Sequence, residues 1–215
     1  MIVVLLGPPG AGKGTQAVRI SKTFGLQHLS SGDILRAERK EMTELGRKAQ
    51  DFMDRGDLVP DDLILAMMMD RIGRPGAAKG CLLDGFPRTV AQAEGLDERL
   101  SERGAKIDIV VNMEVDDAEV TRRLTGRWSC PTDGRIYHEM FSPPGKAGVC
   151  DDCGTALTRR KDDEPSVVAQ RVKTYHAETK PLVAYYQARG LLRPVDASGT
   201  VDAVTASIEK VCRAK

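Results

Sequence analysis

The sequence is poor in aromatic residues, in net charge and in long apolar runs. Only 4% of its 215 residues are Phe, Trp or Tyr, and 32 basic residues nearly balance 31 acidic ones, which leaves a net charge of +1. A chain without a basic excess lacks the electrostatic footprint of proteins that bind nucleic acid or anionic membranes. No apolar run reaches the roughly 20 residues needed to span a bilayer. Nucleic acid and membrane are therefore excluded as main partners.

The first residues also lack the pattern of a secretion signal. Such a signal has a basic segment followed by a cleavable apolar one. Here an apolar run, residues 2–6, leads directly into a glycine-rich loop. We therefore expect a cytoplasmic protein.

Cysteine is scarce and unevenly placed. Of the five cysteines, Cys81 lies in an apolar run and Cys212 in the last helical segment, where buried or bystander thiols are expected. Cys130, Cys150 and Cys153 form a cluster in the sequence. In a reducing cytosol such a cluster indicates a metal site before a disulfide.

One loop near the start of the chain is rich in glycine, Gly7-Pro-Pro-Gly-Ala-Gly-Lys13-Gly-Thr15. The loop follows an apolar run typical of a buried parallel strand and precedes a helical pattern that ends at Gly25. Converging backbone N–H groups, a helix N-terminus and a lysine together make a site for polyphosphate. The loop departs from the general motif because Gly14 follows Lys13, and the hydroxyl comes one step later, at Thr15.

The segment after the second predicted strand, residues 27–29, is long for a simple crossover. Ser30 to Asp33 is a helix-start signal, and we predict short helices broken at Gly46, Gly56 and Pro60. We interpret residues 30–59 as a helical insertion, either a substrate clamp or ordinary helical packing.

The apolar run that ends at Asp84 predicts a buried strand with a carboxylate at its C-terminal edge. A carboxylate there, beside a phosphate loop, suits magnesium held through water. Arg88 follows in an irregular turn at the same edge. Thr89 caps the next helix, whose first turn carries Gln92. That amide has the paired donor and acceptor that a base edge needs, although sequence alone equally allows it to face solvent.

Residues 127–163 contain several prolines and glycines and have little apolar periodicity. Their core is too small to order the segment, so we expect a cross-link such as a bound metal to hold it together. The spacing of Cys130, Asp133, Cys150 and Cys153 predicts a closed tetrahedral site, which is structural rather than catalytic. His138 is an alternative to Asp133 as fourth ligand. Zinc is the favoured metal, iron and cobalt suit the same thiolates, and thiols without metal are the remaining alternative.

The rest of the chain completes an alternation of strands and helices. We predict a strand over residues 107–113, a helix that carries Arg122, Arg123 and Arg127, and a helix from Ser166 to about Gln187. A strand over 191–195 and a closing helix over 200–213 follow. This order predicts a parallel five-stranded α/β sheet flanked by helices, with the phosphate loop after the first strand.

Six motifs occur in a fixed order: GPPGAGKGT, SSGDILR (30–36), DGFPRT (84–89) with Gln92, RRLTGR (122–127), IYH (136–138) and RRKDDE (159–164). Together they closely resemble adenylate kinase in its bacterial long-lid form, over essentially the whole chain. The resemblance also explains Gly14, because adenylate kinases carry Gly-Lys-Gly-Thr.

The resemblance implies magnesium-dependent transfer of a phosphoryl group from ATP to AMP, giving two ADP. It implies a monomer with a P-loop NTPase-like core (1–29, 60–126 and 164–215), an AMP-binding insertion (30–59) and a lid with structural zinc (127–163). Ser31 is often Thr in the family, which keeps the hydroxyl. Asp133 is often Cys in members with a zinc lid and Ser in metal-free members.

The resemblance also implies roles for individual residues. The residues that would hold ATP are Gly10, Ala11, Gly12, Lys13, Gly14, Thr15, Arg123, Arg127, Ile136, Tyr137 and Gly199. The residues that would hold AMP are Ser31, Gly32, Arg36, Asp57, Leu58, Val59, Gly85, Arg88, Gln92, Arg160 and Arg171. The catalytic residues would be Lys13, Arg88, Arg123, Arg160 and Arg171, with Asp84 holding magnesium through water.

Three other functions compete with this one. A kinase for UMP or CMP would share the fold and mechanism, but the long lid and Gln92 favour adenine. A nucleotide-gated module that binds a partner through the cysteine cluster would need a basic or aromatic face around it, and only Trp128, Tyr137 and Phe141 are aromatic there. A redox sensor would lose activity reversibly with oxidant.

Overall fold

The computed structural model describes residues 1–214 and contains the predicted five-stranded parallel sheet. Its strand order is β2-β3-β1-β4-β7, and all four pairings are parallel. The strands are β1 (Ile2–Leu6), β2 (Gln27–Ser30), β3 (Cys81–Asp84), β4 (Ile109–Glu114) and β7 (Leu192–Asp196). The predicted fold class is therefore confirmed, and the strands start or end within about two residues of the expected positions.

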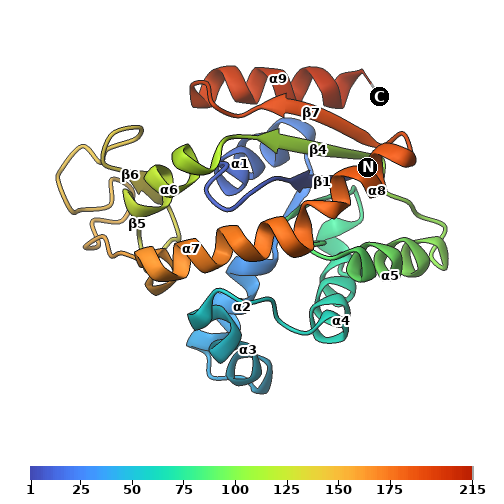
Figure 1. Cartoon of the computed structure of the whole chain (residues 1–215), viewed down its shortest axis with the longest axis horizontal. Coiled ribbons are helices and arrows are strands. Elements are labelled where there is room, and N and C mark those ends of the chain that lie inside the picture. The colour runs from blue at the N-terminus through green and yellow to red at the C-terminus, as the bar shows by residue number, and fades with distance from the viewer. Residues whose placement is uncertain (215) are drawn as a thin grey trace.

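Both faces of the sheet are covered, which is why β1 reads as an unbroken apolar run. Val3 and Leu5 pack into a cluster with α1 (Lys13–Phe24) and α9 (Val201–Arg213). Val4 and Leu6 point to the other face, where they join a cluster that includes α4 (Asp61–Ile72), α5 (Val90–Ser101) and α8 (Pro181–Ala188). In Figure 1, α9 lies along β7 at the top of the view, and α4 and α5 lie below the strands at the lower right.

The parallel register gathers the strand ends at one edge. Leu5 and Ser30 both pair with Asp84, so the loops after β1, β2 and β3 leave the sheet side by side. Ligands of open α/β sheets bind at this carboxyl edge. The fold therefore brings the glycine-rich loop, Ser31 and Arg88 into one neighbourhood.

The segment 30–59 folds as α2 (Ser31–Lys40) and α3 (Glu44–Arg55), which lie together in the lower part of Figure 1. Gly56 and Pro60 flank helix ends as predicted, but the predicted break at Gly46 is wrong. Gly46 lies inside α3, where an added Cβ would come within 2.2 Å of the Glu38 carbonyl oxygen. This glycine permits close packing of α2 against α3 rather than ending a helix.

The helix expected over residues 166–187 is interrupted. The chain forms α7 (Pro165–Thr174), a π-helical turn η3 (Tyr175–Thr179) and then α8. Pro181 has no N–H to continue the α-helical ladder, and the wider turn places a bond from the Lys180 N–H to the Tyr175 carbonyl instead. Sequence periodicity alone does not reveal this change of helix type.

Residues 127–163 form a small unit beside α6 (Asp117–Thr125), at the left of Figure 1. The unit has a two-stranded antiparallel ribbon, β5 (Arg127–Ser129) with β6 (Ile136–His138), and a 3₁₀ turn, η2 (Lys161–Asp163). The predicted helical position of Arg127 is wrong, because α6 ends before Gly126 and Arg127 begins β5. Its buried apolar cluster contains Cys130, Tyr137, Cys150 and Leu157. So small a core agrees with the expectation that the segment needs a cross-link to hold it together.

The remaining regular element is the short 3₁₀ turn η1 (Pro75–Ala77) before β3. Within residues 1–214, no helix combines the length and the apolar character that crossing a membrane requires.

Candidate functional site

The glycine-rich loop joins β1 to α1 with backbone conformations that disfavour residues with a side chain. Gly7 has φ +142°, and an added Cβ there would lie 2.5 Å from the Met113 carbonyl oxygen. Gly12, the residue before α1, has φ +89°. Its lack of a capping side chain leaves the first N–H groups of α1 directed at the loop's hollow. These groups and the helix dipole make an anion site of the predicted kind.

Lys13 lies at the centre of this site. Its Nζ donates hydrogen bonds to the carbonyl oxygens of Gly7 and Pro8, both at 2.7 Å. The pKa of Lys13 is lowered to about 7, first by burial and then by the charges of Arg88 and other nearby arginines, while the charge of Asp84 opposes the shift. The protonated lysine thus sits in a positive field that an anionic ligand would relieve.

Asp84 ends β3, where the sequence predicted it, and is buried. A Cβ added at Gly14 would lie 3.4 Å from its Oδ2, so glycine keeps the space beside this carboxylate open. A hydrated magnesium ion fits such a carboxylate next to a phosphate loop. His28 Nε2 lies 3.3 Å from the same Oδ2, a contact that the sequence did not suggest because His28 is separated from Asp84 by 56 residues.

A group of arginines converges on this edge from distant parts of the chain. Burial lowers the pKa of both Arg88 and Arg160 to about 10, and each feels the charge of Arg36. Burial and the charge of Arg127 also lower the pKa of Arg171, although Asp162 and Asp163 oppose this. Five cations that disfavour each other's charge make a site for a strongly anionic ligand.

Carboxylates not predicted as site residues pair with these arginines. Arg127 forms a two-pronged ion pair with Asp163, and Arg171 Nη1 lies 3.0 Å from Asp162 Oδ2 and 3.2 Å from Asp163 Oδ1. Burial would raise the pKa of Asp162, but the charges of Arg171 and the other arginines lower it. In the sequence these acids belonged to a charge run with no feature that assigns them to the site.

Arg36 is paired in the same way, with Asp33 three residues before it on α2. Burial opposes ionisation of Asp33, but Arg36 outweighs it and lowers the pKa. Arg36, Arg127 and Arg171 can each exchange the paired carboxylate for a phosphate, which accepts the same two-pronged contact.

A cavity opens beside Arg88 between α2, α3, α5 and α7, and we name it the Arg88 cavity. Its lining contains every residue predicted to hold AMP except Arg160, together with apolar and small residues that the sequence did not single out. The lining residues are Ser31, Gly32, Leu35, Arg36, Met53, Gly56, Asp57, Leu58, Val59, Ile64, Gly85, Arg88, Gln92, Asp162 and Arg171. Cations gather on one part of this wall, and aliphatic groups form another, which suits a ligand with a phosphate and a flat apolar ring.

Gln92 is buried and already hydrogen-bonded. Its Oε1 accepts the backbone N–H of Arg88 at 2.7 Å, and its Nε2 donates to Asp61 Oδ1 at 2.7 Å. The solvent-facing alternative for Gln92 is therefore wrong. Asp61, at the start of α4, is a further residue that the sequence reasoning missed.

Arg123 lies apart from the Arg88 cavity. Its guanidinium bonds to Glu119 on the same helix and to the carbonyl oxygens of Ala197 and Ser198, next to Gly199. The two predicted ATP contacts Arg123 and Gly199 are thus neighbours in the fold. The Tyr137 side chain, by contrast, points into the small core of residues 127–163, where its hydroxyl accepts the Asp151 N–H at 2.8 Å. Only the backbone of Tyr137 is left to face a nucleotide.

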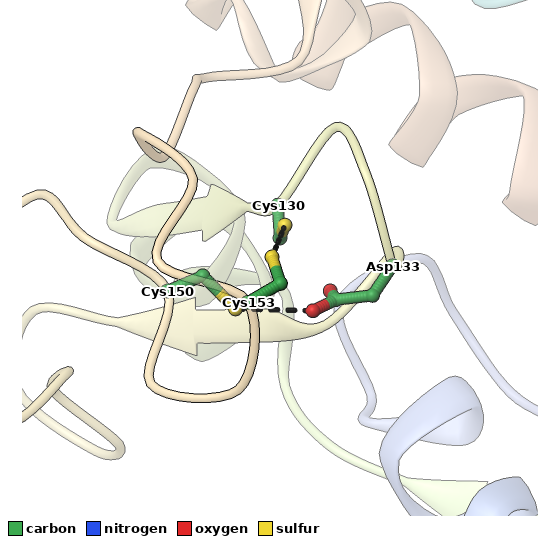
Figure 2. Close-up of side chains that lie close together, drawn as sticks. All are labelled: Cys130, Asp133, Cys150 and Cys153. Carbon is green, nitrogen blue, oxygen red and sulfur yellow. Dashed lines mark hydrogen bonds between the residues drawn. The ribbon is translucent and has the colours of Figure 1, made fainter.

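The predicted metal ligands come together (Figure 2). One ligand atom from each of Cys130, Asp133, Cys150 and Cys153 lies within 4.8 Å of all the others. The Sγ atoms of Cys130 and Cys153 are 3.3 Å apart, and Cys150 Sγ lies 3.1 Å from Asp133 Oδ2. Tetrahedral zinc with sulfur ligands at about 2.3 Å requires ligand separations of roughly this size.

The chemistry of the fourth ligand also fits. The Asp133 carboxylate accepts the Arg135 N–H at 2.9 Å, and this bond, with the neighbouring thiols, lowers the pKa of Asp133. His138 instead accepts the Met140 N–H at Nδ1, and its Nε2 lies 3.4 Å from the Arg122 carbonyl oxygen. Both ring nitrogens are thus engaged elsewhere, which favours Asp133 over His138 as the ligand.

Known proteins resemble this chain over its full length. The adenylate kinase family profile matches residues 5–191. The adenylate kinase of Carboxydothermus hydrogenoformans is 50% identical over 209 residues, which cover 97% of this chain and 98% of that protein. The adenylate kinase of Citrifermentans bemidjiense is 49% identical over 214 residues and the whole of both chains. The adenylate kinase of Caldicellulosiruptor bescii is 51% identical over 192 residues, 89% of each.

The family match and the residues at the sheet edge agree with one another. The phosphate loop, the converging arginines and the Arg88 cavity are the parts that transfer between two nucleotides requires, and the relatives share the whole chain rather than the loop alone. The chain belongs to the adenylate kinase family.

Proposed function

We propose that this chain transfers a phosphoryl group reversibly between magnesium-ATP and AMP, with the glycine-rich loop as the ATP site and the Arg88 cavity as the AMP site. The observation that carries the proposal is the electrostatics of the sheet edge. Lys13 lies in the glycine-rich loop, and its pKa is lowered to about 7 partly by the charges of Arg88 and Arg171, which line the Arg88 cavity. Two phosphate groups brought together there would each find cations already in place.

On the donor side, the loop from Gly10 to Thr15 would surround the ATP phosphates with backbone N–H groups. Lys13 would exchange its two carbonyl partners for phosphate oxygens. Arg123, beside Gly199, would hold the nucleotide from the α6 side. Magnesium bound through water to Asp84 would neutralise charge on the phosphates when ATP is present.

On the acceptor side, Arg36 and Arg88 would bind the AMP phosphate. A guanidinium binds phosphate through two parallel hydrogen bonds, a geometry that lysine does not offer. The aliphatic wall around Leu35, Met53 and Ile64 would pack on the adenine, and Gln92 would read its edge.

During transfer, Arg123, Arg160 and Arg171 would stabilise charge on the moving phosphoryl group. Phosphoryl transfer needs positioning and charge neutralisation more than covalent help from the protein. We assign no general base, because the AMP phosphate is itself a competent nucleophile.

We further propose that residues 30–59 and 127–163 are mobile flaps on a core of residues 1–29, 60–126 and 164–215. Closure of the first over AMP and of the second over ATP would exclude water, which would otherwise hydrolyse ATP. The ion pairs of Arg171 with Asp162 and Asp163 join the end of the second segment to α7 of the core.

Zinc is our proposal for the ion of the four-ligand cluster Cys130, Asp133, Cys150 and Cys153. With four protein ligands the site is closed, so the metal would fasten the segment 127–163 without touching a nucleotide. We also propose a cytoplasmic monomer, because all residues of both nucleotide sites come from one chain and the thiol cluster suits a reducing compartment.

Phosphorus NMR tests the activity directly. The protein is mixed with magnesium-ATP and, in turn, AMP, CMP, UMP or GMP, and Lys13→Met serves as control. We expect ADP signals to grow with AMP alone and to be absent with the variant. Transfer to CMP or UMP would overturn the choice of base, and nucleotide binding without any transfer would overturn the enzyme assignment.

A further inference from the structure

The amide of Gln92 has one fixed orientation in this structure. Its Oε1 faces a group that can only donate, the Arg88 backbone N–H, at 2.7 Å. Its Nε2 faces a carboxylate, which accepts, at Asp61 Oδ1 and 2.7 Å. An amide turned by 180° would set donor against donor and acceptor against acceptor in a place where only 2% of Gln92 is exposed.

Asp61 is held in place by Thr89. The Thr89 hydroxyl donates a hydrogen bond to Asp61 Oδ2 at 3.0 Å. Thr89 Oγ1 also accepts the backbone N–H of Gln92 at 3.0 Å, which caps the start of α5. Asp61 therefore has one oxygen for Thr89 and the other for Gln92. The start of α4 and the start of α5 are tied together through these three side chains.

Asp61 does not line the Arg88 cavity. Gln92 does, whereas Asp61 and Thr89 line an adjoining cavity that also reaches Lys173 and Glu178. Asp61 thus stands on the far side of Gln92 from the proposed nucleotide, where it can act on the base only through the amide.

The bonds within the protein leave half of the amide free. Oε1 keeps one lone pair and Nε2 keeps one hydrogen, so Gln92 offers the ligand one acceptor and one donor in a fixed order. Adenine presents a donor at N6 and an acceptor at N1, and hypoxanthine and guanine present the reverse. Because arginines hold the phosphate, the base meets the amide in one direction, and only one of these two patterns can fit.

We propose that Asp61 is a specificity-determining positioning residue, which selects adenine over 6-oxopurines by locking the Gln92 amide. This inference rests on the proposed function, since it requires the Arg88 cavity to be the AMP site. A freely rotating glutamine would accommodate either base by turning its amide by 180°. The hydrogen bond to Asp61 prevents this rotation, so a 6-oxopurine would leave polar groups of a buried site unpaired and would bind poorly.

Inosine monophosphate is the matched probe for the fixed orientation of the Gln92 amide. Its base differs from adenine at the 6-position and in the proton on N1, so it reverses the hydrogen-bonding pattern with little change in shape. The experiment measures kcat/KM for AMP and for inosine monophosphate at saturating magnesium-ATP, for the wild-type chain and three variants.

Asp61→Ala removes the acceptor opposite Nε2, and we expect the preference for AMP over inosine monophosphate to fall by about tenfold, mainly through KM. Asp61→Asn can still accept from Gln92 with Oδ1 and donate to Thr89 with Nδ2, so it should restore most of the preference. Asp62→Ala is the control, because Asp62 carries the same charge on the same helical turn but is exposed.

The outcomes separate the inference from the function beneath it. An unchanged ratio in Asp61→Ala, or an equal loss with both nucleotides, would overturn the positioning role. If Asp61→Ala does not fold, the same ratio in Asp61→Ser decides, because a serine hydroxyl is too short to reach both Thr89 and Gln92. If the wild-type chain phosphorylates neither nucleotide, the proposed function fails, whatever Asp61 does.

Discussion

The nucleotide site and the four-ligand cluster are built in opposite ways. The nucleotide site collects residues from the loop after β1 and from α2, α5 and α7, which the sheet brings together across more than half of the sequence. The four-ligand cluster comes from two short turns in one segment and rests on a core of four buried residues. The nucleotide site is held in place by a large core, whereas the small core around the four-ligand cluster depends on the cluster itself for its stability. Damage to the first should therefore cost activity, and damage to the second should cost stability.

The largest expected effect is that of Lys13→Met. Removing the one lysine at the phosphate loop should lower kcat by about a thousandfold, because its charge acts where phosphate charge develops. The melting temperature should not fall, since Lys13 bonds only to two loop carbonyls. Lys22→Met, an exposed lysine in the last turn of the same helix, is the control and should keep full activity. Comparable losses in both variants would disprove the special role of Lys13.

Arg88→Lys sharpens the comparison within the nucleotide site. The charge remains, but the two-pronged contact and the bond from Nε to the Gly85 carbonyl are lost. We expect kcat/KM for AMP to fall by about a hundredfold, with the KM for ATP little changed. Steady-state kinetics with each nucleotide varied in turn measures this. An equal loss for both nucleotides would contradict the assignment of the Arg88 cavity to AMP.

Cys150→Ser tests the other half of the comparison. We expect loss of the bound metal and a melting temperature lower by several degrees, with activity at 25 °C reduced less than threefold. Metal analysis, calorimetry and kinetics on one preparation measure all three. Cys212→Ser removes a buried thiol outside the cluster and is the control for thiol loss alone. A folded Cys150→Ser protein without activity would disprove the structural role of the metal.

The two regions also differed in what the sequence revealed. The sheet and the phosphate loop were predictable, because parallel strands buried on both faces are apolar throughout and the loop needs glycine at fixed positions. The clustering of Cys130, Asp133, Cys150 and Cys153 was predictable from spacing, since they lie in two local turns, although the sequence left His138 open as an alternative to Asp133. In both cases the signal is contained in a short stretch of sequence.

The unpredicted part consists of pairings between distant or unremarkable residues. Asp163 and Arg127 are 36 residues apart, and Asp61 and Gln92 are 31 apart. An aspartate that partners a buried side chain looks, in the sequence, the same as one in a solvated charge run. Helix type was also hidden, because the π turn before Pro181 follows from backbone bonding rather than apolar periodicity.

The smallest expected effect is a pH dependence of stability, and it returns to Lys13. Its pKa is about 7 in the folded chain, against an ordinary value of 10.5. Between these values the unfolded chain binds more protons than the folded one, so the free energy of unfolding should rise with pH across this window. Below about pH 7 the lysine is charged in both states, and its burial destabilises the fold in full.

Lys13→Met lacks this penalty. Without nucleotide, the variant should melt a few degrees above the wild-type chain at pH 6.5, and the difference should shrink towards pH 9.5. Lys22→Met should show no such trend. A difference that stayed constant would mean that Lys13 is not buried against the field of Arg88 and Arg171, and the anion site would lose its electrostatic basis. No change in the cysteine cluster should alter this trend, because its ligands form a separate unit of the chain.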